Sequence, residues 1–476
     1  MRYPDAGQMT LNARYAPTSG DEADLVMTGS DAFIARPAGL CVYSDTANSD
    51  CTTGDASCSK FVVAGDPFRL RVGGVAWQAD AAADLCSGNL NTPNYRQVGV
   101  APATAIALSH ALVAPSGGST GNLGVTGLDI AAADTGEKIL TTQSISEVGV
   151  FTVTATPPGS YLSGPGVGDS DGDGDVDIVS VSANIGRFYP ASFLLADPLL
   201  TPACNGSTYA GLSAQAGPPA QGVKAGQTFA FMGALSARNR GGALTRNYTG
   251  SFVKLSAGGI SYTDSRNVGV ISVAGSGLTE PGAAGVGNLD YSANSPSFLF
   301  GAPREPYPLA ILTRATDSDG VTGSIVDVGN PIPGTLPDFR LGQARINNAH
   351  GSELQDLSLP FTASYFNGSG YAPNLLDNCT VFTPASLGAY QRTDTGAGTP
   401  VLASGAYQVA AGAGAYLLRA PGQRSSGSVL LTYDGAPAWL QYDWNGDGVL
   451  DKPTGLATFG IYKGAAPLIF RRELYR

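Results

Sequence analysis

The sequence has 476 residues, of which 43% are hydrophobic and 14% are charged, so it can bury large cores and is not typical of a disordered chain. Its net charge is −11, from 27 basic and 38 acidic residues, and its arginines are scattered, which excludes the basic patch of a nucleic-acid-binding protein. Gly (64) and Pro (31) are frequent but follow no G-X-Y repeat, which excludes a collagen.

Short segments with strand-like patterns recur along the chain, each bounded by turn residues, and sustained helical spacing is absent. The predicted strands cover residues 8–15, 67–77, 148–156, 176–185, 228–238, 250–257, 269–275, 427–435 and 457–464. Many short strands with Gly, Pro, Asn and Asp between them are typical of β-sandwiches. The sequence therefore predicts an all-β protein of tandem Ig-like β-sandwich domains with almost no helix.

Proline-rich connections divide these strands into domains. We expect the end of a preceding β segment over residues 1–30, a first β-sandwich over 31–187, a second Ig-like sandwich over 188–330, and one or more C-terminal β domains over 331–476. The first boundary lies near Arg187–Phe193, because Pro190 restricts the backbone before a new strand. No apolar run approaches the roughly 20 residues of a membrane helix, and residues 1–15 lack the apolar core of a signal peptide. We therefore expect any export signal to lie upstream of Met1.

The cysteines form an even set without C-x-x-C spacing, which favours disulfides in an oxidising compartment. They are Cys41, Cys51, Cys58, Cys86, Cys204 and Cys379. The first four are close enough in sequence to cross-link one domain, and we expect them to pair among themselves. A zinc site is the alternative, but the chain has only two histidines, and neither is near a cysteine.

The segment from Asp169 to Asp177 has the pattern D-x-D-x-D-G-x-x-D, with candidate metal ligands at Asp169, Asp171, Asp173, Asp175 and Asp177. Carboxylate oxygens at alternate positions can converge on a hard cation such as Ca²⁺, and the glycine allows the turn that brings them together. Five aspartates in nine residues would repel one another without a cation. The segment has neither the Glu at position 12 nor the flanking helix of a sensor EF-hand.

A second segment repeats this spacing, with candidate ligands at Asp443, Asn445, Asp447 and Asp451. Two matches in one chain strengthen the prediction of bound Ca²⁺ as a structural cofactor, and solvated acidic turns are the alternative for both segments. A shorter motif, Asp317-Ser-Asp319-Gly320, has too few ligands, and we interpret it as a turn.

The remaining side chains give little indication of catalysis. His110 and His350 are the only imidazoles, and the sequence has no G-x-S-x-G elbow, phosphate-binding loop or dinucleotide fingerprint. Trp439 and Trp444 flank the second acidic segment. We interpret both as core anchors, although an exposed tryptophan there could stack on a sugar.

Several stretches of the sequence resemble, in order, the C-terminal region of the mannose-sensitive haemagglutinin (MSHA) pilus biogenesis Q protein family. They are Ser146–Ala155, Ile185–Phe193, Ala237–Leu255, Phe339–Thr380 and Trp439–Arg476. The resemblance implies an exported, multi-domain β protein associated with the pili or surface of Gram-negative bacteria, and it implies no particular reaction.

We therefore predict a secreted, calcium-stabilised structural or adhesive module of a bacterial pilus or cell surface that is not an enzyme. The expected partners are pilus or cell-surface proteins, with surface glycans as a further candidate and no nucleic acid. The expected location is extracellular or at the cell surface. Two alternatives remain: a lectin-like carbohydrate-binding module that uses the C-terminal calcium loop, and a glycoside hydrolase with paired carboxylates away from both acidic segments.

Overall fold

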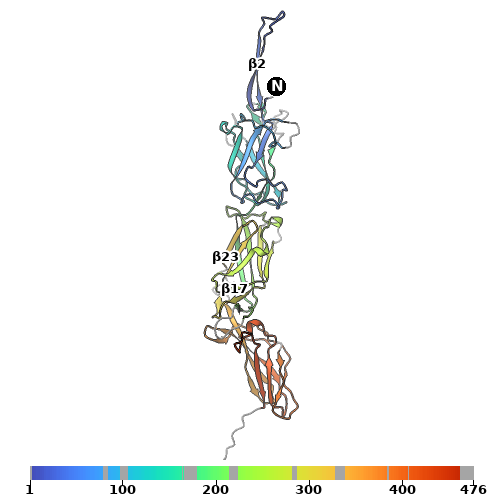
Figure 1. Cartoon of the computed structure of the whole chain (residues 1–476), viewed down its shortest axis with the longest axis vertical. Helices are drawn as coiled ribbons and strands as arrows, with labels where there is room; N and C mark the ends of the chain where they lie inside the picture. The colour runs from blue at the N-terminus through green and yellow to red at the C-terminus, as the bar shows by residue number, and fades with distance from the viewer. Residues whose placement is uncertain are drawn as a thin grey trace, which may run out of the picture.

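The computed structural model describes residues 3–78, 84–96, 106–162, 164–165, 180–213, 223–280, 287–326, 338–382, 385–405 and 407–460. These residues form a hairpin and three β modules that follow one another along an elongated molecule (Figure 1). The helical pieces of this described part are four short 3-10 turns: η1 (Ala132–Asp134), η2 (Gly250–Phe252), η3 (Ala257–Gly259) and η4 (Ala438–Leu440). The predicted all-β, tandem Ig-like architecture is confirmed. No helix within the described ranges has the length and apolar character to cross a membrane.

The hairpin lies at the N-terminal end of the molecule and projects away from the first module (Figure 1). Its strands are β1 (Gly7–Tyr15) and β2 (Met27–Ala35), paired antiparallel from Gly7 opposite Ala35 to Tyr15 opposite Met27. Most of its side chains are exposed on both faces. The hairpin continues past residue 30, where the sequence suggested a boundary.

The first module has two sheets packed around one hydrophobic core. One sheet has the order β3-β4-β7, with β3 (Gly39–Tyr43), β4 (Phe68–Val75) and β7 (Glu137–Gln143). The other has the order β11-β8-β5-β6, with β12 also on β8: β5 (Ile106–Ala114), β6 (Gly127–Leu128), β8 (Gly149–Thr156), β11 (Ser180–Val181) and β12 (Ile185–Phe188). A separate pair consists of β9 (Ser160–Tyr161) and β10 (Gly164–Pro165). The core forms because alternate residues of β4 and β8 point inward, where Phe68 and Phe151 each contact Phe188 edge to face.

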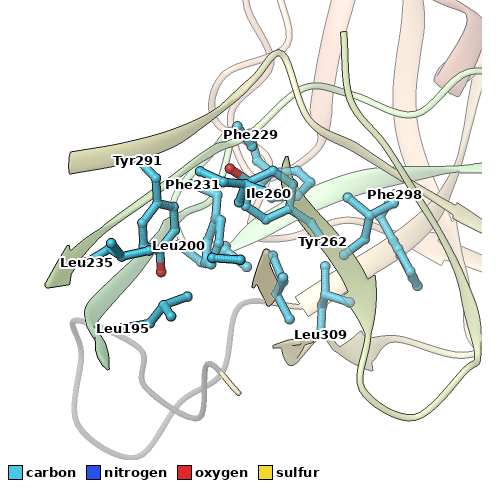
Figure 2. Close-up of a cluster of buried hydrophobic side chains, with 14 of the residues drawn as sticks. Leu195, Leu200, Phe229, Phe231, Leu235, Ile260, Tyr262, Tyr291, Phe298 and Leu309 are labelled. Carbon is cyan, nitrogen blue, oxygen red and sulfur yellow. The ribbon is translucent and has the colours of Figure 1, made fainter. Parts of the chain in front are cut away.

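The second module surrounds the largest cluster of buried side chains. Its four-stranded sheet has the order β13-β15-β19-β18: β13 (Ser192–Thr201), β15 (Ala230–Arg238), β18 (Gly275–Thr279) and β19 (Asn288–Asn294). A three-stranded sheet has the order β16-β22-β23: β16 (Ile260–Asp264), β22 (Ile311–Thr316) and β23 (Thr322–Val326). Figure 2 shows the aromatic centre of the core, in which Phe231 from β15 and Tyr262 from β16 point toward each other from different sheets.

The third module also has two sheets around one core. The first has the order β24-β26-β31-β30 with β27 on β26: β24 (Asp338–Ile346), β26 (Leu357–Phe366), β27 (Tyr371–Pro373), β30 (Val401–Leu402) and β31 (Ala413–Arg419). The second has the order β25-β33-β32-β28 with β29 on β32: β25 (Ala349–Gly351), β28 (Ser386–Leu387), β29 (Gln391–Arg392), β32 (Gly427–Thr432) and β33 (Thr454–Phe459). The rings of Phe361 and Phe382 stack at its centre, 4.3 Å apart.

Strand β24 belongs to both the second and the third module. Its first residues, Asp338–Leu341, pair in parallel with β14 (Ser207–Leu212). On its other side β14 pairs with β20 (Ser297–Phe300), and β20 pairs with β17 (Gly269–Ser272). Two of the first residues of β24, Asp338 and Phe339, also pair antiparallel with β21 (Tyr307–Pro308). Its last residues, Gly342–Ile346, pair with β26 in the third module. One continuous strand therefore passes from one module to the next.

The predicted strand over residues 250–257 is wrong. This segment contains η2 and leads into η3, and the hydroxyl oxygen of Tyr248 accepts hydrogen bonds from the backbone N–H groups of Lys254 and Leu255. The apolar residues that suggested a strand have another use: Phe252 is buried against residues of the first module. A tertiary contact thus overrides the local pattern.

Candidate functional site

The three modules are joined at two junctions, each with buried contacts. At the first junction, Phe252 of the second module is buried in an apolar cluster with Cys51, Ala56, Ala64 and Val148 of the first. Small side chains leave room for one aromatic ring, so the two modules interlock through an apolar contact.

A buried ion pair lies beside this apolar contact. Arg187 on β12 donates from Nη1 and Nη2 to the two carboxylate oxygens of Asp319, at 2.6 and 2.8 Å. Their side chains are only 5% and 11% exposed. Arg187 also donates from Nε to the carbonyl of Cys58, and Lys60 donates to the carbonyl of Asp319 at 2.7 Å. Such planar, two-point pairing fixes orientation as well as distance.

The turn that presents Asp319 is built by Asp317. The Asp317 carboxylate accepts the N–H groups of Asp319 and Val321 and the hydroxyl of Tyr248. Burial raises the pKa of Asp317, and these hydrogen bonds oppose the shift. The interpretation of residues 317–320 as a turn agrees with this geometry, but its role in contacting the first module was not predicted.

Glu147 and Asn247 cross the same junction. The buried carboxylate of Glu147 accepts the backbone N–H groups of Val148, Arg246 and Asn247 at 2.9 to 3.1 Å. Asn247 in turn donates its side-chain amide to the carbonyls of Ser119 and Val148. Burial is the largest influence on the pKa of Glu147 and raises it. Glu147 and the Asn247 side chain each have partners in the other module, so moving one module would leave buried polar groups unpaired.

The second junction contains strand β24 and a disulfide. Cys204 lies before β14 and Cys379 lies in the third module, so the bond between them links the two modules. Tyr209 on β14 packs into the core of the third module and donates its hydroxyl to Asp377 at 2.8 Å. Burial, and then the Asp377 carboxylate, raises the pKa of this phenol well above its usual value.

Lys224 is a fully buried cation at this second junction. Its ammonium donates to the carbonyls of Gly342 and Gln441, at 2.5 and 3.3 Å, and no carboxylate is paired with it among the described ion pairs. Burial lowers the pKa of Lys224 from 10.5 to about 7. No local pattern predicted the burial of Lys224, because its partners come from Gly342 in β24 and Gln441 next to η4.

We expect the stability of this junction to rise with pH. The unfolded chain keeps the Lys224 proton up to its ordinary pKa of 10.5, whereas the folded chain loses it near pH 7. Between these values the unfolded state binds more protons, so the contribution of Lys224 to the free energy of unfolding increases by a few kcal/mol, and below pH 7 this contribution is constant. Denaturant unfolding of wild type and Lys224→Met across this range measures the difference. Lys452→Met, an exposed control, should keep the wild-type slope, and equal slopes in Lys224→Met and wild type would contradict the assignment.

The predicted disulfides are present. Cys41 pairs with Cys86 and Cys51 with Cys58, so the first four cysteines pair among themselves as expected, and Cys204 pairs with Cys379. No cysteine is free.

The second acidic segment forms a turn that is closed by its own hydrogen bonds. The buried carboxylate of Asp443 accepts the N–H groups of Gly446, Asp447 and Gly448, at 2.6 to 3.1 Å. Asn445 donates its side-chain amide to Asp447, and Asp451 accepts the N–H of Trp444. Gly446 and Gly448 have φ of 77° and 86°, conformations in which other residues would be strained.

The side chains of this segment do not converge on a common point as the ligands of a bound cation would. Among the residues that the structure describes, no three His, Cys, Asp or Glu side chains form a group that could hold a metal ion. The first acidic segment, with Asp169, Asp171, Asp173, Asp175 and Asp177, lies outside the described residues. Calcium binding by either segment remains a prediction.

The two tryptophans beside the second acidic segment differ. Trp439 is partly buried and packs against the core of the third module, as expected. Trp444 is 46% exposed, so its interpretation as a core anchor is wrong. His110 makes a hydrogen bond of 2.8 Å to the carbonyl of Thr120, which agrees with a structural histidine.

Together these features define a tandem all-β protein whose modules are joined by buried contacts and a disulfide. Models of the DUF6701 second, third and fourth domains match residues 36–141, 147–339 and 340–474. These three matches cover most of the sequence, and the chain belongs to the DUF6701 family. The boundary between the third and fourth domain falls inside β24, where the structure passes from one module to the next.

Solved structures that match the chain are distant. The adhesin InvE of Yersinia pseudotuberculosis is 11% identical with a TM-score of 0.20, covering 56% of this chain and 59% of its own. The chain thus spans about three fifths of that adhesin structure. Cadherin-like domains 1 to 4 of zebrafish RET are 10% identical, with a TM-score of 0.24 and 83% of each chain covered. The I9–I11 tandem of titin is 8% identical, with a TM-score of 0.18, covering 84% of this chain and 94% of its own. No curated protein matches the sequence.

Proposed function

We propose that this chain is a stiff extracellular rod, a structural or adhesive module of a bacterial cell surface or pilus system that holds other elements at a fixed distance. The observation that carries the proposal is the construction of its two junctions. Modules joined by open linkers move relative to each other by default. Here the first junction contains the buried pair of Arg187 and Asp319, and the second contains a shared strand and a disulfide.

The buried carboxylates support a structural role over a catalytic one. They are Glu147, Asp264, Asp317, Asp377 and Asp443. Each accepts two or more hydrogen bonds from backbone N–H groups, and three of them also accept a tyrosine hydroxyl. Because these carboxylate oxygens are buried and already hydrogen-bonded to the backbone, they are not positioned to exchange a proton with a substrate. We therefore propose that the chain is not an enzyme.

An oxidising location is consistent with three disulfides and no free cysteine. The resemblance to the MSHA pilus biogenesis Q family supports a pilus or surface association with surface proteins as partners. Protease treatment of intact host cells, followed by immunoblotting without reducing agent, tests this location. We expect the chain to be oxidised and cleaved from outside. A reduced chain that is protected until the cells are lysed would contradict the proposal.

We further propose that Ca²⁺ rigidifies the rod at its two acidic segments. In the second segment, the ion would be held by Asp443, Asn445, Asp447 and Asp451. The glycine turns that such a site requires are already formed. The bond between Asn445 and Asp447 would have to open so that both oxygens could turn inward.

We expect Ca²⁺ to raise the melting temperature by several degrees relative to chelator. A cation that binds only the folded state adds about 2.7 kcal/mol at a hundredfold excess over its Kd. Thermal melts of wild type, Asp447→Ala and Asp173→Ala give the contribution of each segment, because each variant should lose part of the shift. Asp434→Ala, outside both segments, is the control. Identical wild-type melts in calcium and chelator would show that the segments are ordinary turns.

A further inference from the structure

A pocket of about 360 Å³ opens on the third module, beside the second acidic segment. Its lining comes from the end of β24 and the following turn, from the start of β33, and from the acidic segment itself: Arg345, Ile346, Asn347, Asn348, Trp444, Pro453 and Thr454. The side chains of Arg345, Asn347, Asn348, Trp444 and Thr454 are exposed. The pocket is therefore mostly polar, with one large aromatic surface.

Trp444 is exposed but held in place. Its ring lies 4.8 Å from that of Tyr442, and its backbone N–H donates to Asp451 at 2.9 Å. The Arg345 guanidinium lies 5.7 Å from the centre of its ring. An exposed tryptophan normally loses rotamer freedom when a ligand binds. Because the contacts with Tyr442 and Arg345 already restrict the Trp444 side chain in the folded chain, binding costs less conformational entropy.

Unused hydrogen-bonding groups surround this ring. Among the described residues, no ion pair includes Arg345, and Asn347 is hydrogen-bonded only through its backbone N–H, to the carbonyl of Pro360. Asn348 uses its oxygen to accept the N–H of Leu456 at 2.8 Å, which orients its amide nitrogen. Arg and Asn side chains together offer several donors and one acceptor around the ring.

We propose that this pocket binds a saccharide, with the apolar face of one pyranose ring on Trp444 and its hydroxyls bonded to Arg345 and Asn347. A pyranose is flat and apolar on one face and carries donors and acceptors around its edge, which matches one aromatic surface rimmed by amide and guanidinium groups. The polar lining disfavours a purely apolar ligand. The protein's net charge of −11 and the neighbouring aspartates disfavour a nucleic acid.

This inference goes beyond the rod and does not depend on bound calcium. The pocket lies on the module farthest along the molecule from the N-terminal hairpin (Figure 1). A rod that carries such a site would present it at a distance from whatever its other end contacts.

Titration of the intact chain with a panel of saccharides tests the proposal. The panel is lactose, maltose, cellobiose, N,N′-diacetylchitobiose and digalacturonate at millimolar concentrations, measured by calorimetry and by tryptophan fluorescence. The chain has only three tryptophans, so a change at Trp444 is visible. We expect at least one of these compounds to bind. Comparing the affinity for digalacturonate with that for the neutral sugars shows whether Arg345 binds hydroxyl groups or a carboxylate.

Three variants identify the site. Trp444→Ala and Arg345→Ala should each weaken binding about tenfold or more, because truncating an anchor of a small site removes much of its affinity. Trp77→Ala removes another exposed tryptophan, 55% exposed in the first module, and should bind like wild type. Equal melting temperatures establish that the variants are folded. The proposal is overturned if no compound in the panel binds, or if Trp444→Ala binds as tightly as wild type.

Discussion

Replacing Asp319 with alanine is expected to destabilise the first junction by roughly 3–5 kcal/mol, because it leaves the buried Arg187 guanidinium without its partner. The Arg187 side chain is held by the carbonyl of Cys58 and cannot easily turn to solvent. The measurement is urea unfolding followed by probes in the first and second modules. We expect the midpoint of unfolding to move to a lower urea concentration, and the probes in the two modules to report different midpoints.

A second ion pair at the same junction provides the matched control. Asp66 pairs with Arg240 through two bonds of 2.6 Å, but the Arg240 side chain is 60% exposed. Water can therefore replace the lost carboxylate, and Asp66→Ala should have little effect. If Asp66→Ala and Asp319→Ala destabilise equally, burial of the Arg187 pair is not what stabilises the junction.

Removing the Cys204–Cys379 disulfide should have the largest effect on the second junction. The bond closes a loop of 175 residues, and the chain-entropy model gives about 5 kcal/mol for a loop of that length. Because it also joins two modules, the double variant Cys204→Ser/Cys379→Ser should convert a shared unfolding transition into two. Differential scanning calorimetry of the oxidised chain records both changes.

The double variant Cys41→Ser/Cys86→Ser serves as the comparison. Its disulfide spans 45 residues, for which the same model gives about 4 kcal/mol, and it lies within the first module, where neither cysteine belongs to the cluster around Phe252. Its loss should lower the first transition without splitting the others. A split transition in both double variants, or in neither, would contradict the assigned role of Cys204–Cys379.

The sequence predicted the fold class well because strand alternation and turn residues are local signals. The segments around Phe68, Phe151 and Phe231 alternate with period two, and they form β4, β8 and β15. Residues 250–257 carry similar apolar spacing, but Phe252 packs against the first module and Leu255 packs into the core of the second without forming a strand. Local pattern cannot distinguish these cases, because the partner surface lies far away in sequence.

The junction residues were missed for the same reason. Arg187 and Asp319 are 132 residues apart, and nothing in the segment near either one indicates the other. Lys224 is similar, since a lone lysine normally indicates an exposed position. The acidic segment at Asp443 was recognisable from spacing, but the local pattern did not show that Trp444 beside it is exposed.

The rigidity of the rod is tested most directly by small-angle X-ray scattering of the intact chain. We predict that one extended arrangement of the three modules reproduces the wild-type curve (Figure 1). A variant that combines Asp319→Ala with Cys204→Ser and Cys379→Ser should require an ensemble of bent shapes. If the wild-type chain already requires such an ensemble and its curve matches that of the variant, the junctions are hinges and the chain is not a stiff rod.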